Sequence, residues 1–441
     1  MDKLRIKKII QETIDRNYKK YIQIGRQLYL TPETGYKEEK TSFAVSESFK
    51  NMGLKVEDGL AITGCRAYAN ENKEGPKIAV FAELDALICE GHPDSMKDTH
   101  AVHACGHNIQ LAVMLGVANA LVESGALEYL DGKIDFIAVP AEESIEFDYR
   151  ENLKEQGKIR YYCGKTEMLY QGFLQDIDMC LMVHNYPLEQ EGYKVVPFIR
   201  SNGMIQKQIV FKGKQSHAGQ APWEGINALN MAAIALNNIQ YQRETFKDSD
   251  MVRIHQIITK GGNIVNCIPE QVTMEMAVRA NNIPAMIDAN EKVNRSLRAA
   301  AIALNGKVEI HDNPGQLPIY ANQELSGLFK KNAGDYYGEK EILPCMDWSA
   351  SSDMGDVSVL KPVLHALTSG IKGSLHSEEY QIINEEDAYI IPIKIICGMI
   401  VDLLFQGEGK AEGIRKEFQP IMTEIEYREY LESVERKYLF S

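Results

Sequence analysis

The order of the predicted elements changes once along the chain, and this change limits the possible folds more than any other feature. Before residue 202, short apolar runs at residues 77–84, 133–143 and 179–185 alternate with segments of helical periodicity. Runs of that length between helices or turns are typical of buried, largely parallel strands. From residue 202 to 312 the order becomes strand, helix, strand, strand, helix, strand. This is the order of a ferredoxin-like βαββαβ sandwich.

Alternation of helices and strands resumes after the sandwich, with a further strand predicted at residues 361–368. We therefore predict an α/β fold in which a mixed, mainly parallel sheet is flanked by helices. This domain comes from two pieces of sequence, residues 1–201 and 313–441, and the βαββαβ domain at residues 202–312 is inserted between them. The tail from Gln406 is charged and has apolar residues spaced as in a terminal helix.

Charge and the first residues exclude some classes of partner. The 441 residues include 48 Lys and Arg against 62 Asp and Glu, a net charge of −14. An acidic chain without a basic block repels phosphate backbones and anionic lipid headgroups, so we expect neither nucleic acid nor membrane as a partner. Residues 3–30 predict an amphipathic helix and contain no unbroken apolar run typical of a signal peptide or membrane span.

The cysteines indicate a reducing compartment. Eight of them are scattered, mostly inside apolar stretches, without the dense regular spacing of a secreted disulfide framework. We therefore expect a cytoplasmic protein.

The sequence HACGH, residues 103–107, is the strongest local indication of chemistry. Cys and His side chains bind borderline metals, and Cys105 and His107 lie in the loop before a predicted helix at residues 108–123. Three further groups follow predicted strands: Asp85, the adjacent Glu142 and Glu143, and His184. Because ligand sites in open α/β sheets lie at the carboxyl ends of strands, we expect these side chains to converge on one crevice.

Each of these residues alone has an ordinary structural explanation. A carboxylate after a strand is commonly a helix cap, a single His is more often a hydrogen-bonded structural residue, and a single Cys is a small core residue. The combination of Asp, Cys-x-His, Glu-Glu and His at strand ends and a helix start favours a shared metal site.

The sequence resembles the metallopeptidase-20 family of dinuclear-metal amidohydrolases. Within that family it resembles the branch of aminoacylases, indole-conjugate hydrolases, and p-aminobenzoyl-glutamate or β-alanyl-dipeptide hydrolases. The resemblance covers nearly the whole chain and rests on PETGYKE, AELDAL, HACGHN, PAEE, KQSHAGQAPWEGINAL, GGNIVNCIP, SSDMGDVS and SLHSEEY. It implies a zinc-exopeptidase-like catalytic domain and an inserted lid or dimerisation domain.

The resemblance also implies a ligand set and a mechanism. The ligands of one or two divalent metal ions, Zn or Mn, would be Cys105, His107, Glu143, His184 and His376, with the Cys105 thiolate shared. Glu142 would be the general base that takes a proton from water as the water attacks an amide carbon.

Residues of the inserted domain resemble family positions that reach the active site of a partner subunit. His217, Asn266 and Arg279 would there steady the oxyanion and the substrate carboxylate, which implies a homodimer formed through the inserted domain. Arg279 could equally form a surface salt bridge, and Asn266 could be a turn residue.

Two departures from the family pattern affect these expectations. Glu83 stands where many relatives outside this branch have a metal-binding His, so the role of Asp85 stays open. The segment at residues 144–176, between Glu143 and His184, is longer than in aminoacylase-like members. This Tyr-rich segment could roof the pocket or lie on the surface.

We therefore predict a metal-dependent hydrolase of an amide bond in a small N-acyl amino acid, aminobenzoyl-glutamate-like or dipeptide substrate. One alternative is a non-catalytic protein that binds metal or a small molecule on the same scaffold. In another, Cys105 is a nucleophile or redox thiol with His107 or His103 as its partner.

Overall fold

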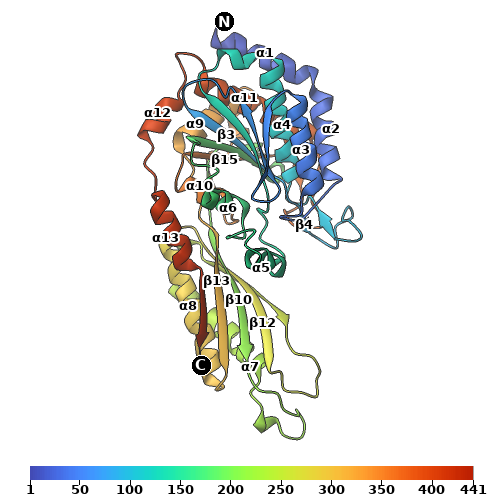
Figure 1. The fold of residues 1–441 in the computed structure, drawn as a ribbon, viewed down its shortest axis with the longest axis vertical. Coiled ribbons are helices and arrows are strands. Elements are labelled where there is room, and N and C mark those ends of the chain that lie inside the picture. Colours follow the sequence, from blue (N-terminus) through green and yellow to red (C-terminus); the bar gives the residue numbers. More distant parts are fainter. Residues whose placement is uncertain (441) are drawn as a thin grey trace. The chain divides into compact units, whose positions relative to one another are not determined.

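The computed structural model describes residues 1–440 and contains two compact units (Figure 1). The first unit comprises Met1–Arg200, Tyr320–Asp347 and Asp356–Ile421. The second comprises Ser201–Ile319, Trp348–Gly355 and the described residues from Met422 on. The predicted α/β class with a ferredoxin-like inserted module is confirmed, whereas the domain boundaries at residues 201 and 312 stay a prediction.

A seven-stranded sheet forms the centre of the first unit, in the order β1-β2-β6-β3-β7-β15-β8. The four inner strands β6, β3, β7 and β15 are parallel, and the outer pairs are antiparallel. The strands are β1 (Lys55–Leu60), β2 (Gly64–Ala69), β3 (Lys77–Glu83), β6 (Lys133–Val139), β7 (Met179–Asn185), β8 (Val195–Val196) and β15 (Val363–Thr368). Because both faces of the inner strands are buried, their sequences are continuous apolar runs.

Helices α3, α4 and α9 contact this sheet directly, and further helices belong to the same unit. The helices of the unit are α1 (Lys3–Arg16), α2 (Tyr18–Tyr29), α3 (Glu39–Asn51), α4 (His107–Glu123), α5 (Phe147–Glu155), α6 (Gly164–Gln171), α9 (Gln323–Ala333), α11 (Ile391–Leu404) and α12 (Ala411–Glu417). Helix α11 continues from a π-helical turn at Glu386–Ile390. Short pairs of strands lie outside the sheet: β4 (Leu87–Ile88) with β5 (Ala101–Val102), and β16 (Ile371–Lys372) with β17 (Gln381–Ile382).

The prediction of a single amphipathic helix at residues 3–30 is wrong in one respect: the chain forms two helices, which are separated at Asn17. The side-chain amide of Asn17 donates to the Thr13 carbonyl at 3.0 Å and to the Glu123 carboxylate at 3.1 Å. A short polar side chain that bonds nearby backbone competes with helical hydrogen bonding. The chain therefore turns between α1 and α2, and both helices bury apolar residues.

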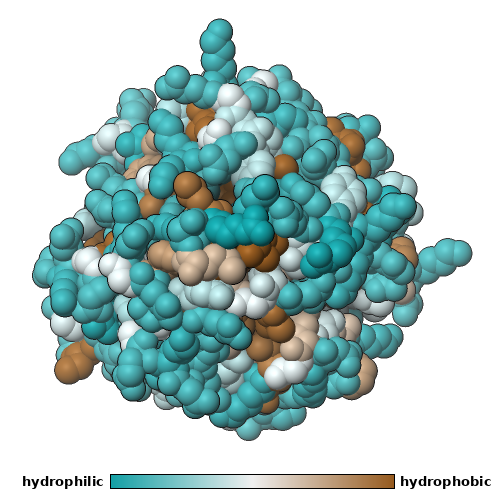
Figure 2. Space-filling view, turned by 90° about the horizontal axis from the view of Figure 1, so that it is seen from above, coloured by the Kyte–Doolittle hydropathy of each residue, from teal (hydrophilic) through white to brown (hydrophobic). Residues whose placement is uncertain are grey.

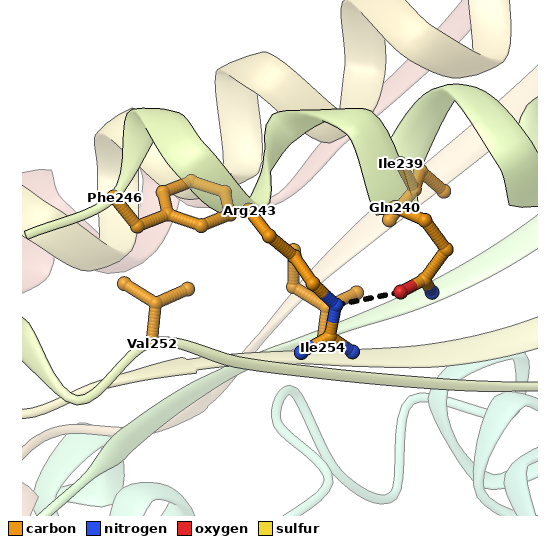
Figure 3. A pocket seen from close by; sticks show the side chains of 6 residues that line it. All are labelled: Ile239, Gln240, Arg243, Phe246, Val252 and Ile254. Carbon is orange, nitrogen blue, oxygen red and sulfur yellow. Dashed lines mark hydrogen bonds between the residues drawn. The ribbon is translucent and has the colours of Figure 1, made fainter. Parts of the chain in front are cut away.

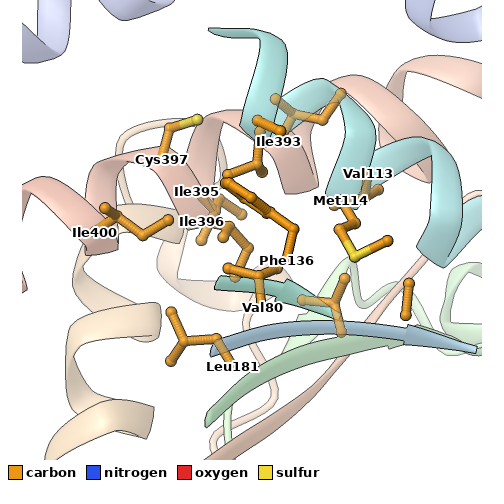
Figure 4. Close-up of a cluster of buried hydrophobic side chains, with 14 of the residues drawn as sticks. Val80, Val113, Met114, Phe136, Leu181, Ile393, Ile395, Ile396, Cys397 and Ile400 are labelled. Carbon is orange, nitrogen blue, oxygen red and sulfur yellow. The ribbon is translucent and has the colours of Figure 1, made fainter. Parts of the chain in front are cut away.

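The main core of the first unit lies between the sheet and the helices α4 and α11 (Figure 4). Phe136 on β6 and Val80 on β3 face Ile393 and Ile396 on α11, and all four are fully or almost fully buried. Helix α4 is buried on nearly all sides, which is unusual for a surface helix and typical of a helix inside a core. This packing fixes the start of α4, where His107 lies.

The second unit contains a five-stranded antiparallel sheet in the order β11-β12-β10-β13-β18. Its strands are β10 (Gly203–Lys212), β11 (Arg253–Lys260), β12 (Gln271–Ala280), β13 (Lys307–Gln316) and β18 (Arg436–Phe440). Its helices α7 (Ala228–Tyr241) and α8 (Ile283–Ala303) bury their apolar faces with alternate residues of the sheet. A cavity of about 20 Å³ between the end of α7 and β11 is lined by Phe246, Val252 and Ile254 among others and has room for little more than a water molecule (Figure 3).

The prediction of a terminal helix in the tail is incomplete. After α12, helix α13 (Glu424–Val434) begins with a capping box in which Thr423 and Glu426 satisfy each other's backbone N–H groups. The chain then forms β18, which pairs with β13 of the second unit. Helix α10 (Met354–Ser358) and strands β9 (Ile199–Ser201) and β14 (Met346–Trp348) lie where the chain passes between the units.

On the face seen in Figure 2, hydrophilic residues cover most of the surface and apolar residues form small groups between them. Among the described residues no helix combines the length and the apolar character needed to cross a bilayer.

One ion pair is buried inside the second unit. Lys207 on β10 contacts Asp312 on β13, and both side chains are at most 1% exposed. Two asparagines of α8, Asn290 and Asn294, donate to the same Asp312 oxygen at 2.9 and 3.1 Å. Lys207 also donates to the Asn294 side-chain oxygen at 2.7 Å, so Asp312 and Lys207 each have several polar partners between the sheet and α8.

We expect Asp312→Ala to lower the free energy of unfolding by ~3–5 kcal/mol, because it leaves the buried Lys207 ammonium without a counter-charge. The double variant Lys207→Met/Asp312→Leu leaves no buried charge and is expected to lose much less. Urea denaturation of the full chain measures both values. Equal losses for the single and the double variant would contradict this account of the pair.

Candidate metal centre

The candidate site lies at the carboxyl ends of three adjacent parallel strands of the first unit. Strand β3 is followed by Asp85, β6 by Glu142 and Glu143, and β7 ends with His184 and Asn185. Since β3 pairs with both β6 and β7 in parallel, these ends share one edge of the sheet. The HACGH loop reaches the same edge and leads into α4.

The structure brings all five predicted metal ligands together in two groups that share Cys105. Ligand atoms of Cys105, His107 and His184 lie within 4.8 Å of one another, and so do those of Cys105, Glu143 and His376. The Sγ atom of Cys105 is 3.5 Å from His184 Nε2 and 3.3 Å from His376 Nε2. The Nε2 atom of His376 is also 3.0 Å from Glu143 Oε1. Two groups that share a sulfur fit two ions bridged by one thiolate.

Backbone geometry allows this convergence. Gly106 has φ +86°, and a Cβ atom there would lie 2.0 Å from Oδ1 of Asn185, so only glycine fits between Cys105 and His107. His376 also has positive φ, at 61°, and its N–H donates to the Ala104 carbonyl at 2.9 Å. The strained turn at His376 is thus tied to the HACGH loop.

Asp85 connects two of the ligands. The Nδ1 atom of His107 donates to the Asp85 carbonyl at 2.8 Å and lies 3.3 Å from Oδ1 of the Asp85 carboxylate. The second carboxylate oxygen accepts the Glu143 N–H at 2.8 Å. In the same way His184 Nδ1 donates to the Asn185 carbonyl at 2.8 Å. These bonds leave Nε2 of both imidazoles directed at the ligand groups, as in metal sites generally.

The PAEE segment turns sharply where the strand ends. The predicted strand at residues 133–143 stops at Val139, and Ala141 has φ +53°. Glu38 holds this turn, because Oε1 accepts the Ala141 N–H at 2.8 Å and Oε2 accepts the Thr63 hydroxyl at 2.7 Å. The turn lets the adjacent Glu142 and Glu143 both lie inside the site, each 7% exposed.

Electrostatics favour a thiolate at Cys105. Burial and the neighbouring Glu143 act to raise the pKa of the thiol, but His376, His107 and His184 outweigh them and lower that pKa to about 6. The Glu143 carboxylate raises the pKa of His376 against the opposing effect of burial. The thiolate is the form of cysteine that binds metal.

The residues fit a divalent metal. Two buried ligand atoms, Nε2 of His107 and Oε1 of Glu143, make no hydrogen bond within the described residues. Each still has a close neighbour of ligand type: Nε2 of His107 lies 3.1 Å from Oε2 of Glu83, and Oε1 of Glu143 lies 3.0 Å from Nε2 of His376. Buried nitrogen and oxygen atoms that lie this close without hydrogen bonds would suit an ion held among them. Thiolate, imidazole and carboxylate together suit Zn or Mn.

Glu142 belongs to a third group. Its carboxylate lies within 4.8 Å of ligand atoms of Glu83 and His107. The predicted general base is therefore at the edge of the ligand groups, and its role stays a prediction.

The predicted residues of the second unit are only partly brought together. His217 and Asn266 lie on adjacent loops, since the Ala218 N–H donates to the Asn266 carbonyl at 2.8 Å. Both side chains are exposed. Arg279 lies near the other end of β12 and donates to the Ser351 hydroxyl at 2.6 Å. The roles predicted for all three stay predictions.

Three residues that support the site were not predicted from the sequence. Glu38 holds the PAEE turn, Arg150 donates to the Glu143 carbonyl, and Lys165 forms an ion pair with Glu83. Glu38 lies inside the PETGYKE motif, which was an available signal. Arg150 and Lys165 lie in the segment at residues 144–176, where nothing in the sequence indicated burial.

Comparison with known families matches residues 199–305 to the peptidase dimerisation domain. An Xaa-Arg dipeptidase of Mus musculus is 27% identical, over 94% of this chain and 92% of that protein. An IAA-amino acid hydrolase of Arabidopsis thaliana is 26% identical, over 90% and 88%.

Among solved structures, a Bacillus subtilis dinuclear metal-binding peptidase of the M20 family matches with a TM-score of 0.64 and 20% identity, over 88% of this chain and 99% of that one. The predicted resemblance to metallopeptidase-20 hydrolases is thereby confirmed, as is the prediction of a metal-dependent hydrolase.

The Glu38 carboxyl provides a test of the PAEE turn in metal-free protein. Burial, then the negative charge of Asp85, raises its pKa to about 8, from 4.5 in a model compound. The folded protein therefore retains this proton when the unfolded chain has lost it, and the resulting stabilisation disappears as pH rises from about 5 to about 8. We expect Glu38→Gln, which cannot ionise, to gain stability relative to the wild type over this pH range.

Urea denaturation in the presence of a chelator at several pH values measures the difference. Glu47→Gln, a change at an exposed ion pair with Lys50, is the matched control and should show no such trend. A constant difference between Glu38→Gln and the wild type would contradict the assignment.

Proposed function

We propose that this chain, a metal-dependent hydrolase of the metallopeptidase-20 type, cleaves the amide bond of a small N-acyl amino acid, aminobenzoyl-glutamate-like compound or dipeptide. One observation carries the proposal. Two groups of metal-binding side chains share Cys105, and the Glu142 carboxylate lies beside His107 of one group.

The chain's own residues would hold two ions. Cys105, His107 and His184 would bind one, and Cys105, Glu143 and His376 the other. Divalent ions bound there supply Lewis acidity that polarises an amide carbonyl and makes water more acidic. Asp85 holds His107 and the Glu143 backbone in place, so its part is positioning.

Glu142 would move the proton. Its carboxylate takes a proton from the attacking water while the water oxygen bonds to the amide carbon. As the carbon–nitrogen bond breaks, the same group returns that proton to the leaving nitrogen, so that a carboxylic acid and an amine are released. A side chain that is 7% exposed and close to the ligands suits this role.

His217 would act in the active site of a second subunit. Its Nδ1 atom accepts the N–H groups of Gly219 at 3.2 Å and Gln220 at 3.0 Å. A neutral imidazole bonded in this way carries its proton on Nε2, and the exposed ring can donate it to a developing oxyanion. The match to a peptidase dimerisation domain supports a homodimer, with Asn266 and Arg279 as substrate contacts.

The relatives suggest which amides to test. Two of them are an Xaa-Arg dipeptidase and an IAA-amino acid hydrolase, and both names describe an acyl group on the nitrogen of an amino acid. The eight free cysteines also support a reducing, cytoplasmic location.

We expect Glu142→Gln to lower kcat by ~10²–10⁴, because it removes the proton acceptor. The metal content should stay the same, since Glu142 lies outside the two groups that share Cys105. Metal-reconstituted protein should be assayed on Xaa-Arg dipeptides, indole-acyl amino acids, p-aminobenzoyl-glutamate, β-alanyl dipeptides and N-acetyl amino acids. Chelation should abolish turnover, and Zn or Mn should restore it.

Glu146→Gln is the matched control, because this nearby glutamate pairs with Lys37 at 2.6 Å outside the ligand groups. It should keep wild-type turnover. Metal-loaded wild type without turnover on the whole panel would contradict the proposal and favour a non-catalytic binding protein.

Complementation tests the homodimer. His217→Ala and Glu142→Gln chains should each be inactive alone, and refolding them together should recover partial activity if His217 serves the partner's site. The recovery comes from mixed dimers, in which one site combines an intact Glu142 with an intact His217. Subunit exchange without recovery would instead indicate a site complete within one chain.

A further inference from the structure

A lysine is buried beside the metal site. Lys165 near the start of α6 is fully buried, and its ammonium lies 2.5 Å from Oε1 of Glu83 at the end of β3. A charged pair without access to water is costly unless each charge has a close partner of opposite sign. Because the cost of removing both charges from water offsets much of their attraction, the pair adds little to the stability of the fold. A role at the adjacent metal site would explain why the pair is present.

Glu83 reaches the ligand groups with its other oxygen. Oε2 of Glu83 lies 3.1 Å from Nε2 of His107 and accepts the side-chain N–H of Gln110 at 2.8 Å. That His107 nitrogen belongs to the ligand group of Cys105 and His184. An ion bound by His107 is thus within reach of the Glu83 carboxylate.

The number of protein ligands determines what such an ion can do. Three protein ligands leave a position open for water or substrate, whereas four close the site as in structural zinc centres. Cys105, His107 and His184 supply three. Glu83 would be the fourth.

We propose that Lys165 is a positioning residue that keeps Glu83 from becoming a metal ligand and so keeps the coordination position open. The ammonium of Lys165 and the amide of Gln110 bind the two oxygens of Glu83 that an ion would otherwise take. The positive charge of Lys165 also repels a cation from the Glu83 side. This inference rests on the proposed hydrolysis, since an open position matters only for turnover.

The segment at residues 144–176 places Lys165 rigidly. A Cβ atom on Gly164 would lie 1.7 Å from the Pro140 carbonyl oxygen, so α6 begins in direct contact with the PAEE turn. The Gly164 N–H donates to the Ala141 carbonyl at 3.2 Å. Arg150 of the same segment, 1% exposed, donates to the Glu143 carbonyl. The segment is therefore built into the wall of the site.

The test compares Lys165→Met, Lys165→Arg, Glu83→Gln and the double variant Lys165→Met/Glu83→Gln. Lys194→Met is the matched control, because Lys194 pairs with Asp387 at 2.7 Å away from the ligand groups. Three properties are measured: the affinity for Zn by competition with a chromophoric chelator, the absorption spectrum of the Co²⁺-loaded protein, and kcat. The first two do not depend on knowing the substrate.

We expect Lys165→Met to bind the metal more tightly, by about tenfold or more, to change the Co²⁺ spectrum and to lose turnover, because Glu83 now closes the site as a fourth ligand. Adding Glu83→Gln should return the affinity and spectrum to those of the wild type and restore turnover in part. Lys165→Arg keeps the charge and should keep the wild-type spectrum, as should Lys194→Met.

If Lys165→Met does not fold, the single variant Glu83→Gln tests whether Glu83 is a metal ligand in the wild type. It should keep the wild-type Co²⁺ spectrum and metal affinity, because Glu83 is not a ligand while Lys165 holds it. A large loss of affinity in Glu83→Gln would show that Glu83 binds metal in the wild type and would overturn the proposal. So would an unchanged affinity and spectrum in folded Lys165→Met. Absence of turnover in the wild type would overturn only the proposed hydrolysis.

Discussion

The carboxylate of Asp85 joins two parts of the chain that the sequence keeps far apart. The Asp85 carbonyl accepts a hydrogen bond from Nδ1 of His107 at the start of α4, and Oδ1 of its carboxylate lies close to the same atom. The other carboxylate oxygen accepts the N–H of Glu143 after β6. Because Asp85 follows β3, the middle strand of the three, its backbone is fixed by the most buried part of the sheet. The orientation of the ligand atoms thus depends on packing that begins well away from them.

The site also depends on balanced charge among side chains that are shielded from solvent. Glu38, Glu83 and Asp85 are all completely buried within the first unit. Lys165 balances Glu83, and hydrogen bonds from Thr63 and Ala141 satisfy Glu38. Since an unpaired buried charge costs several kcal/mol, Glu83 needs the counter-charge of Lys165, whereas Glu38, whose pKa burial raises to about 8, stays neutral and needs only hydrogen-bond partners.

The part of this arrangement that depends on local spacing could be predicted from the sequence. HACGH places Cys105 and His107 on one loop, and the rule that ligands gather at the ends of parallel strands added Glu143 and His184. Lys165 could not be predicted, because a lysine in a short helix is normally exposed and its burial depends on where α6 packs. The break at Asn17 and the pairing of β18 with β13 also depend on tertiary contacts, which periodicity does not record.

The second unit is built from three separate stretches of chain, so the backbone passes between the two units five times. Its outer strand β18 comes from the last of these stretches, and Ser351, which binds Arg279, comes from the middle one. A protease that cuts one connection would leave the two halves covalently joined. Excising residues 201–319 alone would produce a fragment with an uncovered sheet edge. A graft of this unit onto another protein would therefore have to carry all three stretches, including the one that supplies β18.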